Sequence, residues 1–221
     1  MSSITDCPHR GSKKSSETKY CDECGVPLEA EKPSRPEGEM TEQEFDALLQ
    51  LREGKDQLLK HHPRSPIPES VRQGFKGANY FPIEPSYRFF CRLIRYPDTT
   101  TIRMMTSTGD EREYLRIGYV TFAIGDKTLT LQTYKTVHEN ENEGERESLF
   151  TPFRDATSGK ETYGSGRYLE IEEAEDGLFL VDFNRAYNPY CTYSDKFSCP
   201  YPPKENWLDV EIRAGERKFR D

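Results

Sequence analysis

The runs "EYLRIGYVTFAI" (residues 113–124) and "KTLTLQTYKT" (residues 127–136) decide the fold class of this chain. Both are rich in β-branched and aromatic residues, and the Gly-Asp pair that joins them is typical of a tight hairpin turn. In the second run Leu129 and Leu131 project to one side of an extended chain, while the Thr and Gln residues between them project to the other. The pattern predicts a β-hairpin with one buried face.

Six further runs with strand character accompany this hairpin. They are "SYRFFCRLIRY" (86–96), "TTTIRMMTS" (99–107), "SLFTPFRD" (148–155), "GRYLEIEE" (166–173), "GLFLVDFN" (177–184) and "WLDVEIRAGE" (207–216). About eight short strands at hairpin spacing favour a mainly β fold, either an antiparallel β-barrel or a sandwich. The strands do not alternate with long helical segments, which argues against a doubly wound α/β fold.

The segment "TEQEFDALLQLREGKDQLLKHHPRSP" (residues 41–66) predicts one helix before the strands. Thr41 and Glu44 have the spacing of a capping box, and Pro63 ends the helical pattern. The apolar positions close to one helical face are Phe45, Leu48, Leu49 and Leu51, extended by Leu58 and Leu59. We expect this N-terminal helix to pack against the sheet.

Composition and charge limit the function classes. The 221 residues carry a net charge of -8, which argues against a general phosphate-binding surface. Hydrophobic residues make up 33% and charged residues 32%, as in a soluble domain with one modest core. No run approaches the roughly 20 apolar residues that span a bilayer, and the first residues lack the apolar region of a secretory signal. We therefore expect a cytoplasmic protein without membrane contact, whose cysteines stay reduced.

Three segments follow from these patterns. Residues 1–30 are polar and contain cysteines, residues 31–40 ("EKPSRPEGEM") have the composition of a linker, and residues 41–221 would form the β-rich domain.

The first segment contains residues with zinc-ligand chemistry, which are Cys7, His9, Cys21 and Cys24. It resembles the short zinc ribbons written CPxCG…CxxCG, in which four ligands hold one tetrahedral zinc ion. The resemblance implies a structural zinc, since so short a segment cannot bury a core of its own. Arg10 stands where the second ligand belongs, so either His9 completes the site from a shifted position or the site is degenerate.

Two long strings late in the chain have an unusual composition. They are "PFRDATSGKETYGSGRYLEI" (152–171) and "DFNRAYNPYCTYSDKFSCPYPPKENWLDVEIRAGE" (182–216). Through them the chain resembles the domain of unknown function 1684 family, over about residues 45–217. The resemblance implies a compact β-rich unit, and it supplies no known substrate, cofactor or catalytic residue.

The polar residues of these strings are the candidate ligand-binding positions. They are Arg154, Asp155, Thr157, Ser158, Tyr163, Arg167, Asp182, Asn184, Tyr187, Asn188, Cys191 and Tyr193. The two arginines and two aspartates have the chemistry of a bidentate ion pair, which either holds a planar or anionic ligand or locks two loops together. We expect "FRDATSG" and the tyrosine-rich stretch after Asp182 to form the walls of any pocket, with side chains replacing regular backbone hydrogen bonds.

Cys191 and Cys199 lie eight positions apart and allow three interpretations. They form a disulfide in an oxidising setting, remain spare thiols, or belong to a second metal site. No histidine lies close in sequence, which argues against thiol catalysis.

Two function hypotheses of different class remain. The first is a module that binds a small ligand or a protein, attached to a structural zinc ribbon. The alternative is a hydrolase- or isomerase-type enzyme that uses Asp155, Asp182, Glu205 and an arginine at the mouth of the β-domain. The locally basic "HRGSKKSSETK" also allows a nucleic-acid partner for the first segment.

Overall fold

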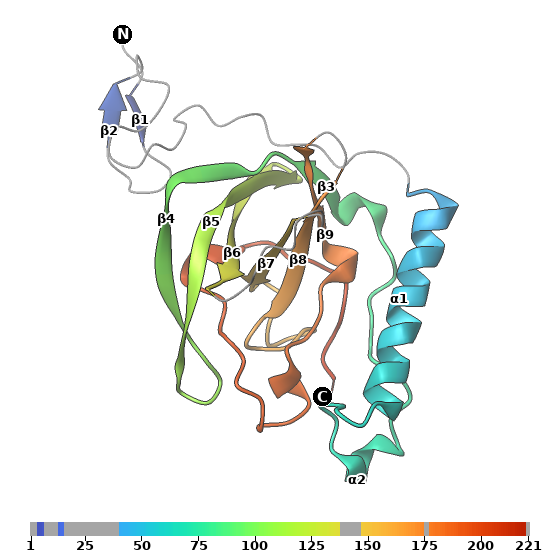
Figure 1. Ribbon diagram of the computed structural model, residues 1–221. Helices are drawn as coiled ribbons and strands as arrows, with labels where there is room; N and C mark the ends of the chain where they lie inside the picture. The colour runs from blue at the N-terminus through green and yellow to red at the C-terminus, as the bar shows by residue number, and fades with distance from the viewer. Residues whose placement is uncertain (1–3, 7–12, 16–39, 138–146, 175–176, 220–221) are drawn as a thin grey trace.

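The computed structural model describes residues 4–6, 13–15, 40–137, 147–174 and 177–219 (Figure 1). Within them, one sheet of seven antiparallel strands has the order β3-β9-β8-β7-β6-β5-β4. The strands are β3 (Arg88–Cys91), β4 (Ile94–Met105), β5 (Glu111–Ile124), β6 (Lys127–Thr136), β7 (Ser148–Phe153), β8 (Arg167–Glu173) and β9 (Phe179–Asp182). The helices are α1 (Glu42–His61) and α2 (Glu69–Arg72), with short 3-10 turns at Pro85–Tyr87, Phe183–Arg185, Tyr190–Thr192 and Lys204–Asn206.

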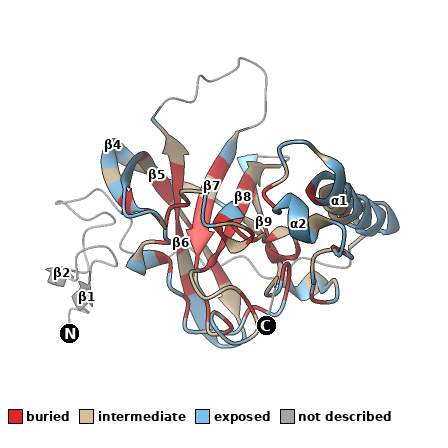
Figure 2. Cartoon of the chain, turned by 90° about the horizontal axis from the view of Figure 1, so that it is seen from below, coloured by how far each residue is buried: buried red, intermediate tan, exposed pale blue. Residues whose placement is uncertain are grey.

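The sheet curls into a half-barrel whose inner face holds the main core (Figures 1 and 2). The predicted mainly β, antiparallel fold is therefore confirmed, and the architecture is a single curled sheet rather than a two-layer sandwich. Phe183 closes the core, since its ring lies 5.2 Å from that of Phe153, 5.4 Å from Phe122 and 6.2 Å from Phe89. Truncation of such a buried ring costs about 3–5 kcal/mol.

The predicted hairpin is the longest pairing in the sheet. Strands β5 and β6 are in register from Ile124↔Lys127 back to Tyr114↔Thr136, with a shift between Arg116 and Gly118. At Gly118 a Cβ atom would lie 2.3 Å from the Ile94 carbonyl oxygen, so only glycine permits β4 to approach this closely.

The two N-terminal strand predictions have different boundaries in the structure. The run at residues 86–96 is divided between two strands, because the strand conformation is interrupted at residues 92–93. After this interruption β4 begins at Ile94. Pro97 lies within β4, where the register with β5 shifts between Arg95 and Thr100. Proline is tolerated here because β4 is an edge strand and needs fewer ladder hydrogen bonds.

Helix α1 has the predicted capping box and the predicted end. The Glu44 amide donates to Thr41 Oγ1 (3.2 Å), and Glu44 Oε2 accepts from the Thr41 amide (2.9 Å). Glu44 also accepts from Arg88 of β3 (2.7 Å), and this bond, together with the Thr41 amide, lowers the pKa of Glu44 to about 2. The first turn of α1 is thus joined to the sheet by the ion pair between Glu44 and Arg88.

The apolar face predicted for α1 is only partly covered. Leu48 and Leu59 are buried, so the helix does pack on the domain as expected. The remaining predicted positions are exposed, namely Phe45 (41%), Leu49 (45%), Leu51 (49%) and Leu58 (42%). Two of them, Leu51 and Leu58, line a groove described below.

The strand predicted at residues 207–216 is wrong. This segment has Leu208, Ile212 and Ala214 buried, but it forms no strand, and its backbone bonds partly to other irregular segments and partly to side chains. Arg167 donates to the carbonyl oxygens of Ile212 (2.9 Å), Ala214 and Glu216 (3.1 Å). For these three carbonyls, a buried guanidinium therefore takes the place of the neighbouring strand that the sequence pattern implied.

Near the N-terminus, β1 (Ile4–Asp6) and β2 (Lys13–Ser15) pair in antiparallel fashion. The proposed zinc ligands Cys7, His9, Cys21 and Cys24, and residues 31–39 of the proposed linker, lie outside the described residues. In the described part of the chain no cluster of His, Cys, Asp and Glu has the composition of a metal site. Neither α1 nor α2 is long and apolar enough to cross a membrane.

Candidate functional site

A row of aromatic rings covers part of the outer face of the sheet. Because side chains alternate along β7, Leu149 and Phe153 enter the main core and Phe150 points to the opposite face. Phe150 stacks on Tyr114 of β5, with ring centroids 5.4 Å apart, and meets the edge of Tyr168 of β8 at 4.9 Å. The outer face is therefore apolar from β8 across β7 to β5, with β6 lying between β7 and β5.

Tyr187 extends this row toward α1. Its backbone exchanges two hydrogen bonds with Tyr168 (2.8 and 3.0 Å), and the two rings meet edge to face at 5.7 Å. The ammonium group of Lys55, on α1, lies 5.0 Å from the centre of the Tyr187 ring. The aromatic row thus connects the sheet to the helix.

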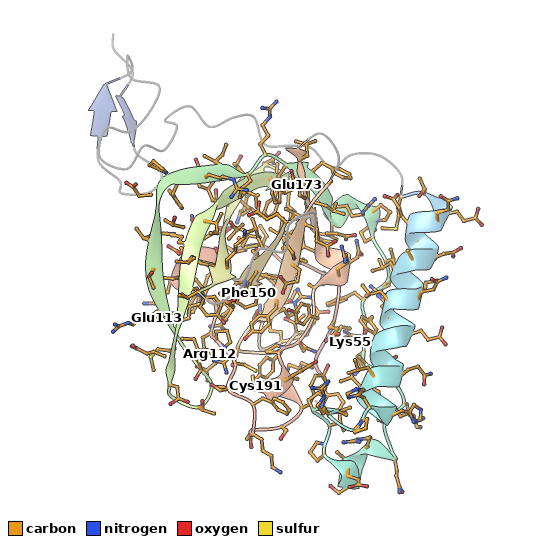
Figure 3. All side chains as sticks on the ribbon, viewed as in Figure 1. Lys55, Arg112, Glu113, Phe150, Glu173 and Cys191 are labelled. Atoms are coloured by element: carbon orange, nitrogen blue, oxygen red, sulfur yellow. The ribbon has the colours of Figure 1, made fainter. Side chains whose placement is uncertain are left out.

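A groove of about 1230 Å³ lies above this row, between α1 and the segment at residues 196–200. We call it the α1 groove. Helix α1 supplies an aliphatic wall, which consists of Leu48, Leu51, Leu58 and Leu59. The opposite wall contains Phe197, Cys199 and Pro200, and Tyr190 stands beside them. Figure 3 shows Lys55 pointing from α1 toward the sheet and Arg112 on the β5 side, with Phe150 between them.

The opposite wall is fixed by contacts with the turn after β4. The Ser107 amide donates to the Cys199 carbonyl (2.9 Å), and the Tyr201 amide donates to the Met105 carbonyl (2.8 Å). The Tyr168 hydroxyl donates to the Pro200 carbonyl (2.6 Å). Two of these bonds join backbone to backbone and the third comes from a side chain of β8, and together they hold the irregular segment against the sheet.

Cationic groups predominate in the α1 groove. Among the described lining residues are Arg52, Lys55, Arg112, Arg185 and Lys196, against the single carboxylate of Glu216. Three of the cations are engaged within the protein: Arg52 donates to two carbonyls, Lys55 pairs with Glu216, and Arg185 pairs with Glu172. Arg112 and Lys196 are exposed and form no ion pair within the described residues.

Glu216 is the centre of a buried polar cluster at the α1 end of the groove. It is 1% exposed, and it accepts from Lys55, from the Asn188 amide (2.7 Å) and from the hydroxyls of Tyr80 and Tyr193 (both 3.4 Å). Burial first, and then the carboxylate of Glu216, raise the pKa of Tyr80 and of Tyr193, so both hydroxyls remain donors. The cluster ties α1 to the C-terminal segment.

Of the two arginines and two aspartates considered for an ion pair, Arg167 and Asp155 pair with each other, with a distance of 3.0 Å. Their side chains are 0% and 1% exposed, so the pair has no access to a ligand in this structure. Asp155 Oδ1 also accepts from Thr157 Oγ1 (2.7 Å) and from Ser158 Oγ (3.2 Å). The "DATSG" turn therefore bonds to the C-terminal segment, and it does not line the α1 groove.

The other predicted positions fall in separate surroundings. Asp182 pairs with Arg88 (3.2 Å) near the start of α1, and burial raises the pKa of Asp182. The Arg154 guanidinium lies 4.4 Å from the ring centre of Trp207. The Tyr163 hydroxyl lies 3.7 Å from Cys191 Sγ.

Two of the twelve predicted residues, Asn184 and Tyr187, line the α1 groove. Asn188 and Tyr193 reach it indirectly, through their bonds to Glu216. Sequence reasoning missed the residues that α1, β5, β7 and β8 contribute. The available signal was the set of aromatic residues at strand positions opposite the core, but the sequence does not show what covers that face.

The carboxylates considered for catalysis do not converge. Asp155 is paired with Arg167, Asp182 with Arg88, and Glu205 with Arg116 and the Tyr134 hydroxyl. These are three separate networks, and none of the three carboxylates lines the α1 groove.

Comparison with known proteins places the chain in a family. A family model described as "Protein of unknown function (DUF1684)" matches residues 73–217, which is more than half of the 221 residues. The chain belongs to the DUF1684 family. The predicted resemblance is thus confirmed over the β-domain, while residues 1–72 of this DUF1684 protein lie outside the match.

This DUF1684 protein is also similar to a solved structure. That structure is the solution NMR structure of an uncharacterized protein from gene locus rrnAC0354 of Haloarcula marismortui. The identity is 35% and the TM-score 0.61, and the likeness covers 79% of this chain and 95% of the other. No curated protein matches this sequence. Neither comparison names a ligand or a reaction.

Proposed function

We propose that this DUF1684 protein binds an elongated, apolar small molecule that carries one anionic group, and that it does so in the α1 groove. The observation that carries the proposal is the combination of an aromatic floor and an aliphatic wall with two exposed cations that have no ion pair among the described residues, in a protein whose net charge is -8.

The apolar character of the ligand follows from side chains that remain exposed inside the groove. Leu51 is 49% exposed and Leu58 is 42% exposed, and both face the aromatic row across the groove. Covering the exposed half of each side chain contributes about 1 kcal/mol. Large concave apolar surfaces of this kind are typical of ligand sites.

The anionic group follows from the local charge. A protein with a net negative charge repels anions in general. A groove with cations along its low-dielectric walls nevertheless has a positive local potential, which attracts an anionic group. Arg112 and Lys196 are the exposed lining cations without an ion pair in the described chain, so we assign them to the anionic group. The hydrocarbon part would then extend along Leu51 and Leu58.

Isothermal titration calorimetry with dodecanoate tests this proposal. Its 14 non-hydrogen atoms at about 0.5 kcal/mol each give a Kd on the order of 10 μM. Dodecan-1-ol should bind more weakly, and dodecylammonium more weakly still, because it meets the cations with a like charge. Equal affinity for the anion and the ammonium would refute the assignment of charge.

Matched variants separate the anion site from general surface charge. Arg112→Ala combined with Lys196→Ala removes two exposed contacts of about 0.5–1 kcal/mol each, which predicts a 5- to 30-fold weaker dodecanoate complex. Lys204→Ala removes an exposed lysine that does not line the groove, and should leave the Kd unchanged. Because the double variant removes two charges and the control only one, a control loss of about half the free energy lost by the double variant would mean that net charge alone attracts the ligand.

The enzyme hypothesis receives no comparable support. A hydrolase or isomerase of the kind considered needs carboxylates and an arginine converging in an open cleft. Asp155 and Asp182 are instead buried in ion pairs with Arg167 and Arg88.

We further propose that Cys7, Cys21 and Cys24, with His9 as the fourth ligand, hold one structural zinc ion that lets residues 1–30 dock the β-domain on a partner. The support is the composition of the donor set, since three thiolates and one imidazole suit tetrahedral zinc. Elemental analysis of the purified chain should find about one zinc per molecule, and Cys24→Ser should lower this ratio strongly. A metal-free wild-type protein, purified without chelators, would refute the proposal.

A further inference from the structure

Two cysteines from the two ends of a short irregular segment meet beside the α1 groove. Cys191 lies in the 3-10 turn Tyr190–Thr192, and Cys199 precedes Pro200. The Cys191 amide donates to Cys199 Sγ at 3.2 Å. Both are free cysteines, with 9% and 7% of their surfaces exposed, and Cys199 lines the groove.

This contact brings the two cysteines close to the spacing of a disulfide. The Cα atom of Cys191 is about 1.46 Å from its amide nitrogen, so Cys199 Sγ lies within about 4.7 Å of that Cα. Because this sulfur is only two bonds from its own Cα, the two Cα atoms lie at most slightly beyond the roughly 4.4–6.8 Å that a disulfide needs. Side-chain rotation, with at most a small shift of the backbone, brings the two sulfur atoms into bonding distance.

The surroundings make the two thiols chemically unequal. The hydrogen bond from Cys199 lowers the pKa of Cys191 to about 6 against the opposing effect of burial, and the Tyr163 hydroxyl and Ser107 add to the lowering. The same thiol–thiol hydrogen bond, followed by burial, raises the pKa of Cys199. The titratable and charged groups that face the pair from neighbouring elements are Tyr163, Tyr168 of β8 and Arg112 of β5.

We propose that Cys191 and Cys199 are a reversible redox pair, in which Cys191 reacts with a hydroperoxide and Cys199 closes the disulfide. With hydrogen peroxide, the Cys191 thiolate attacks one peroxide oxygen and the O–O bond breaks. The products are a sulfenic acid on Cys191 and hydroxide, which takes up a proton to become water. The Cys199 sulfur then attacks the sulfenic sulfur and the S–O bond breaks. The thiol proton and the departing hydroxide form a second water.

Peptide mapping of the peroxide-treated full chain tests the proposal. The reduced protein is titrated with hydrogen peroxide, its remaining thiols are blocked with N-ethylmaleimide, and the product is digested with trypsin. Cleavage after Arg185, Lys196 and Lys204 separates the two cysteines into peptides 186–196 and 197–204. We expect these two peptides to be joined and dithiothreitol to release them. Recovery of both as maleimide adducts, at peroxide concentrations that oxidise free N-acetylcysteine, would overturn the proposal.

Single substitutions test the separate roles. In Cys199→Ser, Cys191 should retain a sulfenic acid that dimedone captures, whereas in Cys191→Ser, Cys199 should not be labelled. Equal labelling in both variants would contradict the assigned roles. Cys91, 1% exposed in the main core, serves as the internal control and should stay unoxidised.

The pH dependence of alkylation gives a measurement that needs no oxidant. Iodoacetamide should modify Cys191 with a midpoint near pH 6, against about 8.5 for an ordinary cysteine. At pH 7 this difference corresponds to a roughly 30-fold larger thiolate fraction. Cys199→Ala removes the main hydrogen bond and should move the midpoint upward. A wild-type midpoint near 8.5 would refute the assignment of Cys191 as the reacting thiolate.

Discussion

Replacing Asp155 by asparagine tests how the C-terminal segment is held. Asp155 Oδ2 accepts from Arg167 Nη2 (3.0 Å) and from the Ile212 amide (2.9 Å), and Oδ1 accepts from Thr157 Oγ1 (2.7 Å). Asparagine has nearly the same shape, but its NH2 group replaces one of the two carboxylate oxygens. Since both oxygens accept hydrogen bonds, this NH2 group would face donors in either orientation. It also leaves the charge of Arg167 uncompensated in a site without solvent.

Loss of one partner of a buried ion pair costs about 3–5 kcal/mol, so Asp155→Asn should lower the free energy of unfolding by that amount. In a protein of this size the Tm should fall by about 6–20 °C. The matched control is Arg213→Ala, because Arg213 lies in the same segment and pairs with Glu161 at the surface (3.0 Å, 55% and 33% exposed). It should cost less than about 1 kcal/mol.

Urea denaturation followed by circular dichroism measures both effects under identical conditions. If Asp155→Asn costs no more than Arg213→Ala, the buried pair does not anchor the C-terminal segment. The account of why residues 207–216 need no neighbouring strand would then be wrong.

Two further predictions concern the helix cap and a glycine. The lowered pKa of Glu44 means that its carboxylate stabilises the native state above the ordinary value of 4.5, and that this contribution is lost as the pH falls toward 2. Glu44→Gln should therefore lower the unfolding free energy at pH 6 by less than about 1 kcal/mol, since the Glu44 side chain is 42% exposed. At pH 3 the loss should be smaller still. An equal loss at both pH values would contradict this prediction. At Gly215 (φ +74°) a Cβ atom would lie 2.6 Å from the Ala186 carbonyl oxygen, whereas at Gly109 (φ +85°) it would meet open space. Gly109→Ala should cost about 1 kcal/mol through backbone strain, and Gly215→Ala about 1–3 kcal/mol more, as measured by urea unfolding; equal costs would show that the close approach is not limiting.

The sequence predicted those parts of the fold whose determinants are local. The hairpin at residues 113–136 was predictable because its alternation and its Gly-Asp turn lie within a few residues of each other. The capping box at Thr41 and Glu44 is local in the same sense, and both predictions are confirmed.

The segment at residues 207–216 shows where local reasoning fails. Its apolar alternation is real, since Leu208, Ile212 and Ala214 are buried, but the carbonyls of Ile212 and Ala214 bond to the side chain of Arg167, about 45 residues earlier, and not to a neighbouring strand. Alternation of apolar residues therefore predicts burial. It does not predict whether the backbone groups find their hydrogen-bond partners in a strand or in a side chain.

The candidate site was predictable only on one of its sides. The tyrosine-rich stretch after Asp182 was expected to be an ordered crossing, and Asn184 and Tyr187 do line the α1 groove. The contribution of α1 was not predictable, because the exposure of Leu51 depends on how far the helix stands from the sheet. Asp155 and Arg167 have the chemistry of a binding site, and only their burial shows that they hold the fold together.

The most direct test of ligand binding in the α1 groove compares two leucines of one helix. Leu51 (49% exposed) lines the groove and Leu49 (45% exposed) does not, so Leu51→Trp should obstruct the groove while Leu49→Trp adds the same bulk elsewhere. Because both side chains are largely exposed, neither substitution should unfold the protein. Dodecanoate titration should show a Kd at least about tenfold weaker for Leu51→Trp, a loss of about 1.4 kcal/mol, and an unchanged Kd for Leu49→Trp. Equal affinity in the two variants, or no dodecanoate binding by the wild-type chain, would contradict the proposed function.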